Sequence, residues 1–425
     1  MTEGKSENWR DTILAGLANY IDAGSIVAGS AALAFWKADF GLSDTFIGLI
    51  AAFSANAISA GIGALIGGIL CDKFGRKKIY QYDMLFYAFG MAWLVFASAP
   101  WMIVLGFVLV GLAVGADIPA SWSLIAEQAP DDSRGKHSGV AQVLWYLGPV
   151  VVLLAGLALA PLGLFGVRLI FAHLLVLALA LTLLRSKMHE SRYWLEAQAE
   201  AKVRTAGMRE LFQPKYIKSM LFLIGMYGFW NLWAGTNGFF FPYILRTVGG
   251  QSQEASVALQ ALNFGLGIFS IFLVFMKFSD RMNQRLLFLI SALMQVVGMM
   301  LLALFPLTTG IALLHVVIMA TAIGFGAQSF FQLWSSELFP TLIRSTAQGV
   351  TFAVVRIGLG IFSFFVPLIT STGFTNLAWI LTGFLAASAL IGWFGAPRNE
   401  GKSLEQLAAE RGDLRALEAE RPAAV

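Results

Sequence analysis

The chain has 425 residues, of which 58% are hydrophobic and 13% are charged, and its mean hydropathy is +0.73. Soluble domains are roughly 45–50% apolar and 25% charged, so this composition excludes an ordinary soluble protein and indicates a chain that is solvated by lipid. The single cysteine, Cys71, excludes an intramolecular disulfide.

Twelve apolar runs follow one another along the chain, each near the roughly 20 residues that a transmembrane helix needs. They cover residues 11–36, 45–71, 81–97, 101–125, 138–160, 165–184, 217–245, 255–277, 286–305, 309–334, 347–371 and 374–395. We therefore expect an all-α membrane protein with twelve transmembrane helices. Because the first run is long and follows a polar amino end, we expect it to remain in the protein rather than to be removed as a signal peptide. The seventh run contains Pro242, where we expect the helix to break.

The positions of lysine and arginine predict the orientation, because cytoplasmic loops collect these residues. If the amino terminus lies inside, 25 of the 29 fall in cytoplasmic segments, including the loop from Arg185 to Lys218. The four exceptions are Lys37, Arg168, Arg246 and Arg356. We therefore expect both termini to be cytoplasmic in a multi-pass protein of the cell (inner) membrane. This topology explains the net charge of +4 without a nucleic-acid partner.

The longest polar stretch between the runs separates six expected helices from six. It predicts an N-terminal six-helix half (1–185), a cytoplasmic linker (186–216), a C-terminal six-helix half (217–396) and a cytoplasmic tail (397–425). Two weak internal repeats support this pseudo-symmetric division. The first pairs GGILCDKFGRKK (67–78) with FMKFSDRMNQR (275–285), and the second pairs SLIAEQAPDDSRG (123–135) with SSELFPTLIRSTAQG (335–349). Repeated halves are typical of secondary transporters that work by alternating access.

Residues 68–78 read G-x-x-x-D-x-x-G-R-K-K, which resembles the signature loop of the major facilitator superfamily. Four further segments resemble its sugar porter family and related bacterial metabolite:proton symporters: residues 119–135 with Glu127 and Arg134, HESRYWL (189–195), SSELFPTLIRSTAQG and GAPRNEGKSLEQL (395–407). The resemblance runs over nearly the whole chain. It implies the major facilitator fold and a monomeric secondary active transporter that needs no cofactor or metal and is not an enzyme. The chain also lacks the GxxxxGK[ST] loop of ATP-driven proteins.

Matching these motifs position by position implies a cytoplasmic gate of charged residues. The expected gate residues are Asp72, Gly75, Arg76, Glu127, Arg134, Glu190, Arg192, Asp280, Arg281, Glu337 and Arg344. In this interpretation Asp72 caps or pairs near a helix end, while Arg76 reaches a neighbouring carboxylate in a latch that breaks when the cytoplasmic side opens. The alternative is that these are solubilising loop charges.

The expected solute site departs from that of the sugar porters. Gln142 lies eight residues after Arg134, as a sugar-contacting glutamine does in that family, but the seventh run lacks the family's paired glutamines and Phe107 replaces its arginine. The resemblance therefore leaves a sugar, a polyol or an organic acid as the small polar solute. The candidate contacts are Gln142, Asn231, Trp233, Asn237, Gln332 and Arg356.

Ionisable groups within a span cost several kcal/mol unless they are paired or hydrated, so each is a functional candidate. Asp22 lies where proton-coupled relatives place an acid, and Asp117 could share the proton or pair with a cation. Arg356 must pair with an internal acid such as Asp22 or Asp117, or with an anionic solute. We expect His173 and His315 to be packing histidines.

The leading hypothesis is inward symport of the solute with a proton that Asp22 carries. An exporter or uniporter of the same fold, in which Asp22 is structural, is one alternative. A membrane sensor that binds solute without transporting it is the other, and the retained gate motifs argue against it.

Overall fold

The computed structural model describes residues 9–130, 133–186, 188, 190–200, 211–371, 373–398, 402 and 406–407. Every regular element in this part of the chain is a helix, which confirms the all-α prediction. The helices are α1 (Trp9–Phe40), α2 (Asp44–Ala52), α3 (Ile58–Phe74), α4 (Arg76–Val95), α5 (Pro100–Gln128), α6 (Arg134–Leu159), η1 (Ala160–Leu162), α7 (Leu164–Arg185), α8 (Arg192–Glu200), α9 (Pro214–Thr247), α10 (Gln253–Ser270), the π-helical turn η4 (Ile271–Phe275), α11 (Met276–Phe278), α12 (Gln284–Leu304), α13 (Thr309–Ile323), α14 (Ala327–Glu337), α15 (Thr341–Ser371) and α16 (Phe374–Gly395).

Within the described residues, eight helical segments are long and apolar enough to cross a membrane. They are Pro100–Gln128, Arg134–Leu162, Leu164–Arg185, Glu254–Phe278, Gln284–Leu304, Thr309–Glu337, Thr341–Val366 and Phe374–Gly395. The other four expected spans coincide with α1, α3, α4 and α9. Of these, α3 has only 17 residues, and α1, α4 and α9 carry the buried polar side chains Asp22, Asp83 and Asn231.

Three of the expected spans are interrupted. Residues 53–57 separate α2 from α3, residues 324–326 separate α13 from α14, and η4 inserts a π-helical turn after α10. Such interruptions release backbone groups from the helix ladder, and in a membrane protein they are tolerated where the chain is buried in protein or lines a cavity.

The predicted break at Pro242 is wrong, because α9 continues through this residue to Thr247. Proline lacks the N–H that would normally bond the carbonyl of Gly238. The side chain of Gln260 on α10 compensates, since its Nε2 donates to the carbonyls of Gly238 at 3.5 Å and of Asn237 at 3.4 Å. A neighbouring side chain therefore satisfies the backbone that the proline frees.

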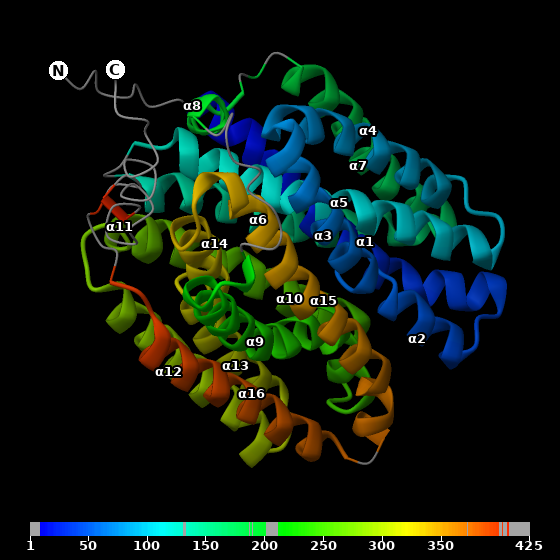
Figure 1. The fold of residues 1–425 in the computed structure, drawn as a ribbon. Helices are drawn as coiled ribbons and strands as arrows, with labels where there is room; N and C mark the ends of the chain where they lie inside the picture. The colour runs from blue at the N-terminus through cyan, green and yellow to red at the C-terminus, as the bar shows by residue number, and fades with distance from the viewer. Residues whose placement is uncertain are drawn as a thin grey trace, which may run out of the picture.

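The helices form two bundles, α1–α7 and α9–α16, that pack side by side (Figure 1). The most extensive contact between them is α15 against α3, and α10 packs against α6 in the corresponding way. Gly68 on α3 and Gly349 on α15 face each other, and a Cβ atom on either one would collide with a backbone carbonyl of the opposite helix, Ser345 O or Ala64 O. Small residues thus bring the two backbones close together, as in other membrane helix pairs.

The first and last described segments of the chain meet at the start of α6. The ring of Trp9 stacks on His137, with 4.1 Å between ring centroids, and Arg134 donates to the carbonyl of Lys402. We call this the terminal end of the molecule. Residues 201–210 of the expected linker and most of the expected tail lie outside the described residues.

Candidate solute cavity and gate

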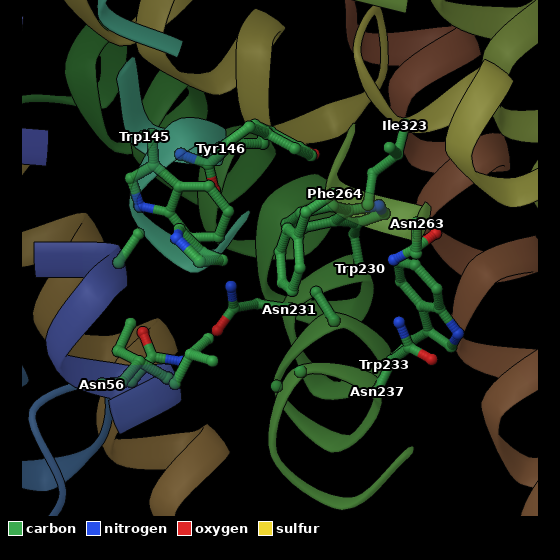
Figure 2. A pocket seen from close by; sticks show the side chains of 18 of the residues that line it. Asn56, Trp145, Tyr146, Trp230, Asn231, Trp233, Asn237, Asn263, Phe264 and Ile323 are labelled. Carbon is green, nitrogen blue, oxygen red and sulfur yellow. The ribbon is translucent and has the colours of Figure 1, made fainter. Parts of the chain in front are cut away.

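A cavity lies between the two bundles, about midway along their helices, and its open space, mouth included, is about 580 Å³. Among the described residues, its polar lining consists of amides, indoles, one phenol and one guanidinium, with no aspartate or glutamate. These polar residues are Asn56, Trp145, Tyr146, Trp230, Asn231, Trp233, Asn237, Asn263, Gln328 and Arg356. In Figure 2, Trp145 and Tyr146 lie on one side of Asn231, and Trp233 and Asn263 lie on the other.

Four of the six expected solute contacts line this cavity: Asn231, Trp233 and Asn237 on α9, and Arg356 on α15. The other two, Gln142 and Gln332, do not. They are fully buried and bond to each other, with Gln142 Nε2 donating to Gln332 Oε1. Gln142 precedes Tyr146 by one turn of α6, so this pair joins the bundles directly beneath the cavity on the side of the terminal end.

Sequence reasoning missed several lining residues, including Asn56, Trp145, Tyr146, Asn263 and Gln328. The sequence could have marked the amides as candidate lining residues, because an asparagine or glutamine within an apolar run needs a polar partner or a hydrated surface. The aromatic residues gave no such signal, since most aromatic side chains in a membrane helix pack against protein or lipid.

Of the two partners considered for Arg356, the internal acid is not found, since Arg356 forms no ion pair with Asp22 or Asp117 in the described structure. In the described part of the chain its hydrogen bonds go to neutral oxygens. Nη1 donates to Asn56, to both the side chain and the carbonyl (3.3 Å), and to Asn231 Oδ1 (3.4 Å), while Nη2 donates to the Tyr227 hydroxyl (3.3 Å). The guanidinium therefore joins residues of both bundles at the cavity wall.

The two expected proton-coupling residues have different surroundings. Asp22, 3% exposed, precedes the lining residue Ala23, and its Oδ1 has no hydrogen-bond partner among the described residues. Asp117 forms an ion pair with Arg185 at 3.0 Å. Arg185 is the last residue of α7 and its side chain is fully buried, rather than exposed in the polar loop in which we expected it.

The expected gate residues meet at the terminal end, where two ion pairs join the bundles crosswise. Arg344 of α15 contacts Glu127 of α5 at 2.6 Å, and Arg134 of α6 contacts Glu337 of α14 at 3.2 Å. Arg76 also reaches Glu127, at 3.1 Å. These glutamates and arginines are buried, so the gate charges are not merely solubilising loop charges in this structure.

Two aspartates of the internal repeat add a second layer of contacts between the bundles. Asp72 pairs with Arg76 at 3.1 Å and accepts from the backbone N–H of Thr346 at 2.6 Å. Asp280 accepts from the N–H groups of Gly135 (2.8 Å) and Lys136 (3.2 Å), which lie in the first turn of α6 and have no partner within that helix. Asp280 thus caps a helix of the opposite bundle. Burial raises the pKa of Asp280, although the two N–H donors oppose this effect.

The remaining expected gate residues are Glu190, Gly75, Arg281 and Arg192, and no hydrogen bond or ion pair described for them joins the two bundles. Glu190 accepts from the backbone N–H groups of Arg76 and Lys77 and so caps α4. Gly75 has φ of +98°, and a Cβ atom there would collide with the Glu190 carboxylate. Arg281 is exposed. Arg192 begins α8, and its side chain lies outside the described structure.

The family model described as the Major Facilitator Superfamily matches residues 12–363. The chain belongs to this superfamily. The chain is also similar to the "Minor myo-inositol transporter IolF" of Bacillus subtilis (strain 168), with 48% identity over 421 residues that cover 96% of this chain and 95% of the relative. Membership of the superfamily makes the protein a multi-pass secondary active transporter of the cell membrane and not an enzyme.

Solved structures of the Major Facilitator Superfamily share this fold. The proton:xylose symporter XylE bound to 6-bromo-6-deoxy-D-glucose matches with a TM-score of 0.82 at 20% identity, covering 95% of this chain and 98% of that one. The inward-open conformation of XylE from E. coli matches less well, with a TM-score of 0.69 at 20% identity and coverage of 95% and 99%.

Proposed function

We propose that this transporter moves a neutral cyclic polyol of the myo-inositol kind, or a related sugar, into the cell together with a proton. The observation that carries the solute class is the cavity lining, in which the described residues supply five amides, from Asn56, Asn231, Asn237, Asn263 and Gln328, and no carboxylate. Amide side chains both donate and accept hydrogen bonds, as hydroxyl groups do. The similarity to a myo-inositol transporter supports the same class.

The charge of the lining argues against ionic solutes. Among the described residues of the cavity wall, a cationic solute would meet Arg356 and no carboxylate. An anionic solute would have Arg356 alone as its counter-ion, and this guanidinium already donates to Asn56, Asn231 and Tyr227. A polyol can instead join this neutral hydrogen-bond network.

Trp233 can pack against the apolar face of a ring, and we propose that Gln142 and Gln332 contact the solute when the bundles part.

We propose twelve transmembrane helices with both termini in the cytoplasm, so that the terminal end is the cytoplasmic side. The concentration of 25 of the 29 lysines and arginines in segments on one side supports this orientation. The halves 1–185 and 217–396 would then rock about the cavity in a monomer, and the ion pairs of Glu127 and Glu337 would break when the cavity opens to the cytoplasm.

We propose that Asp22 carries the coupled proton. It is buried beside the cavity, one of its oxygens lacks a hydrogen-bond partner in the described structure, and Arg356 on the cavity wall acts on it electrostatically. Solute that binds Arg356 would alter this field, and a carboxylate that responds to its neighbours in this way can take up and release a proton. An exporter or uniporter with a structural Asp22 is the alternative.

Solute-induced proton uptake in proteoliposomes tests both parts of the proposal. Separate pools of cyclic polyols, sugars and small carboxylates would be added to the wild-type protein, to Asp22→Asn, and to Asp39→Asn, which removes an exposed carboxylate of the same helix. We expect proton entry with the polyol pool that Asp22→Asn abolishes and Asp39→Asn retains. Proton entry only with carboxylates would overturn the solute class, and polyol flux without proton movement would overturn symport.

A further inference from the structure

A second group of buried charges lies in the N-terminal bundle, apart from the solute cavity. Arg185, at the end of α7, contacts Asp117 of α5 at 3.0 Å and Asp83 of α4 at 3.5 Å through the same atom, Nη1. Its guanidinium carbon lies 3.5 Å from the centroid of the Tyr80 ring, and Nη2 donates to the carbonyl of Leu14 at 3.4 Å. The side chains of Asp83 and Asp117 are 2% and 0% exposed. Four helices therefore enclose two carboxylates around one cation.

The charges in this group do not balance if both carboxylates are ionised. Two negative charges would then face one positive charge out of contact with water, and like charges in a buried site disfavour full ionisation. Asp83 and Asp117 both contact the same nitrogen atom, Arg185 Nη1, and each has an Oδ2 atom without a hydrogen-bond partner in the described structure. A proton on one carboxyl would let it donate to the other, as in a carboxylate dyad.

Asp83 and Asp117, which we call the dyad, lie between Asp22 and the terminal end. At 1.5 Å per residue, Asp22 is about 20 Å along α1 from its first described residue, whereas Asp83 is about 10 Å from the start of α4 and Asp117 about 16 Å from the end of α5. The two carboxylates are therefore nearer to the gate than Asp22, whose Oδ1 has no hydrogen-bond partner in the described structure.

We propose that Asp83 and Asp117 share one proton beside Arg185 and form a proton-binding site through which the proton released by Asp22 passes toward the terminal end. The transfer of the proton from Asp22 through this site rests on the proposed symport, whereas the proton shared by Asp83 and Asp117 does not. In the transfer, the carboxylic acid of Asp22 becomes a carboxylate and the ionised member of the dyad becomes an acid. Arg185 stays charged throughout and holds both carboxylates in place. Arg185 thus supplies a buried cation to the N-terminal bundle. Phe107, which replaces the arginine of the sugar porters, packs instead against the rings of Trp36 and Phe171.

Infrared spectroscopy of the full-length protein in lipid near neutral pH tests the shared proton directly, because a protonated carboxylic acid has a C=O stretching band that a carboxylate lacks. We expect the Asp22→Asn variant, in which Asp22 cannot contribute, to retain such a band. Adding either Asp83→Asn or Asp117→Asn to this variant should remove the band. The exposed-site control Asp39→Asn should leave the band unchanged, and Asp83→Glu should restore a shifted band. Loss of every such band in Asp22→Asn alone would overturn the proposal of a shared proton. Arg185 would then have only a structural role, as the ion-pair partner of the two carboxylates.

Transport measurements in proteoliposomes test the passage. In Asp83→Asn we expect loss of proton-driven solute accumulation, with retention of solute exchange, which needs no net proton release. Solute exchange also shows that the variant is folded. Accumulation at the wild-type level in both Asp83→Asn and Asp117→Asn would overturn the passage. Absence of solute-induced proton uptake in the wild-type protein would overturn the symport and the passage together, while the infrared band would still decide whether the dyad holds a proton.

Discussion

Arg344 and Glu127 lie 217 residues apart in the chain and form an ion pair of 2.6 Å between the two bundles. The repeat-related pair, Arg134 and Glu337, makes the same kind of contact in the opposite direction. Each arginine thus pairs with the glutamate of the other repeat. Closure of the terminal end therefore depends on how the two bundles face each other, and its stability can be tested at either pair.

Glu127→Gln should weaken this closure, because it removes the carboxylate that Arg76 and Arg344 share. Breaking a buried pair from one side costs about 3–5 kcal/mol, although opening the gate would hydrate the stranded charges. The single cysteine, Cys71, is buried at this end and reports the opening. We expect its alkylation rate to rise by at least about tenfold, which corresponds to about 1.4 kcal/mol. Glu196→Gln, on the exposed face of α8, should leave the rate unchanged, and an unchanged rate in Glu127→Gln would contradict the gate.

Gly75→Ala should lower the Tm more than Gly41→Ala does. Both glycines have positive φ, +98° and +62°, but only at Gly75 would a Cβ atom collide with another side chain, the carboxylate of Glu190. Backbone strain in such regions costs about 1–3 kcal/mol, and displacement of Glu190 from the start of α4 adds the loss of a helix cap. Equal losses of Tm in the two variants, measured in the same detergent, would show that the contact with Glu190 contributes nothing.

The bond between Gln260 and the carbonyl of Gly238 can be tested with a double-mutant cycle. Gln260→Leu should destabilise the protein by about 1 kcal/mol, because the carbonyl that Pro242 frees loses its partner. Pro242→Ala supplies an N–H to the same carbonyl, so Gln260→Leu should cost less in that background. Stability measured by denaturation in mixed micelles gives the interaction energy, and additive losses would contradict this role of Gln260.

Arg356→Gln should weaken binding of a cyclic polyol by about 10- to 100-fold, because hydrogen bonds to a charged group are worth about 1.5–3 kcal/mol. Quenching of the cavity tryptophans Trp230 and Trp233 gives the Kd. Lys37→Gln removes an exposed cation and serves as the control. Unchanged polyol binding in Arg356→Gln would remove this residue from the solute site.

Asp280→Asn should change how stability depends on pH. Because burial raises the folded-state pKa of Asp280, its contribution to stability is fully present below its unfolded pKa of about 3.9 and is lost as pH rises through the folded pKa. The stability of the wild-type protein relative to Asp280→Asn should therefore fall as pH rises through this window. The difference in Tm between the two proteins, followed from acidic to neutral pH, measures the effect. A difference that grows with pH would contradict the raised pKa.

The amino-acid sequence by itself determined that the protein is helical, that it lies in a membrane and that it belongs to this superfamily. Apolar runs of spanning length and motifs in the loops are local features, and their physical meaning does not depend on distant residues. The repeated spacing of Glu127 and Arg134, and of Glu337 and Arg344, also marked the charged residues of the gate. The sequence could not tell which glutamate pairs with which arginine.

Tertiary structure decided the pairings and the surroundings of the buried polar groups. Arg185 stands at the end of an apolar run beside a basic loop, and only the packing of four helices turns it inward to Asp83 and Asp117. Arg356 meets neutral oxygens, and α9 continues through Pro242 because Gln260 of another helix reaches its backbone. The physical reason is the same in each case. A charged or polar group in a lipid-solvated protein must find partners, and the rotation and packing of neighbouring helices determine which partners lie within reach.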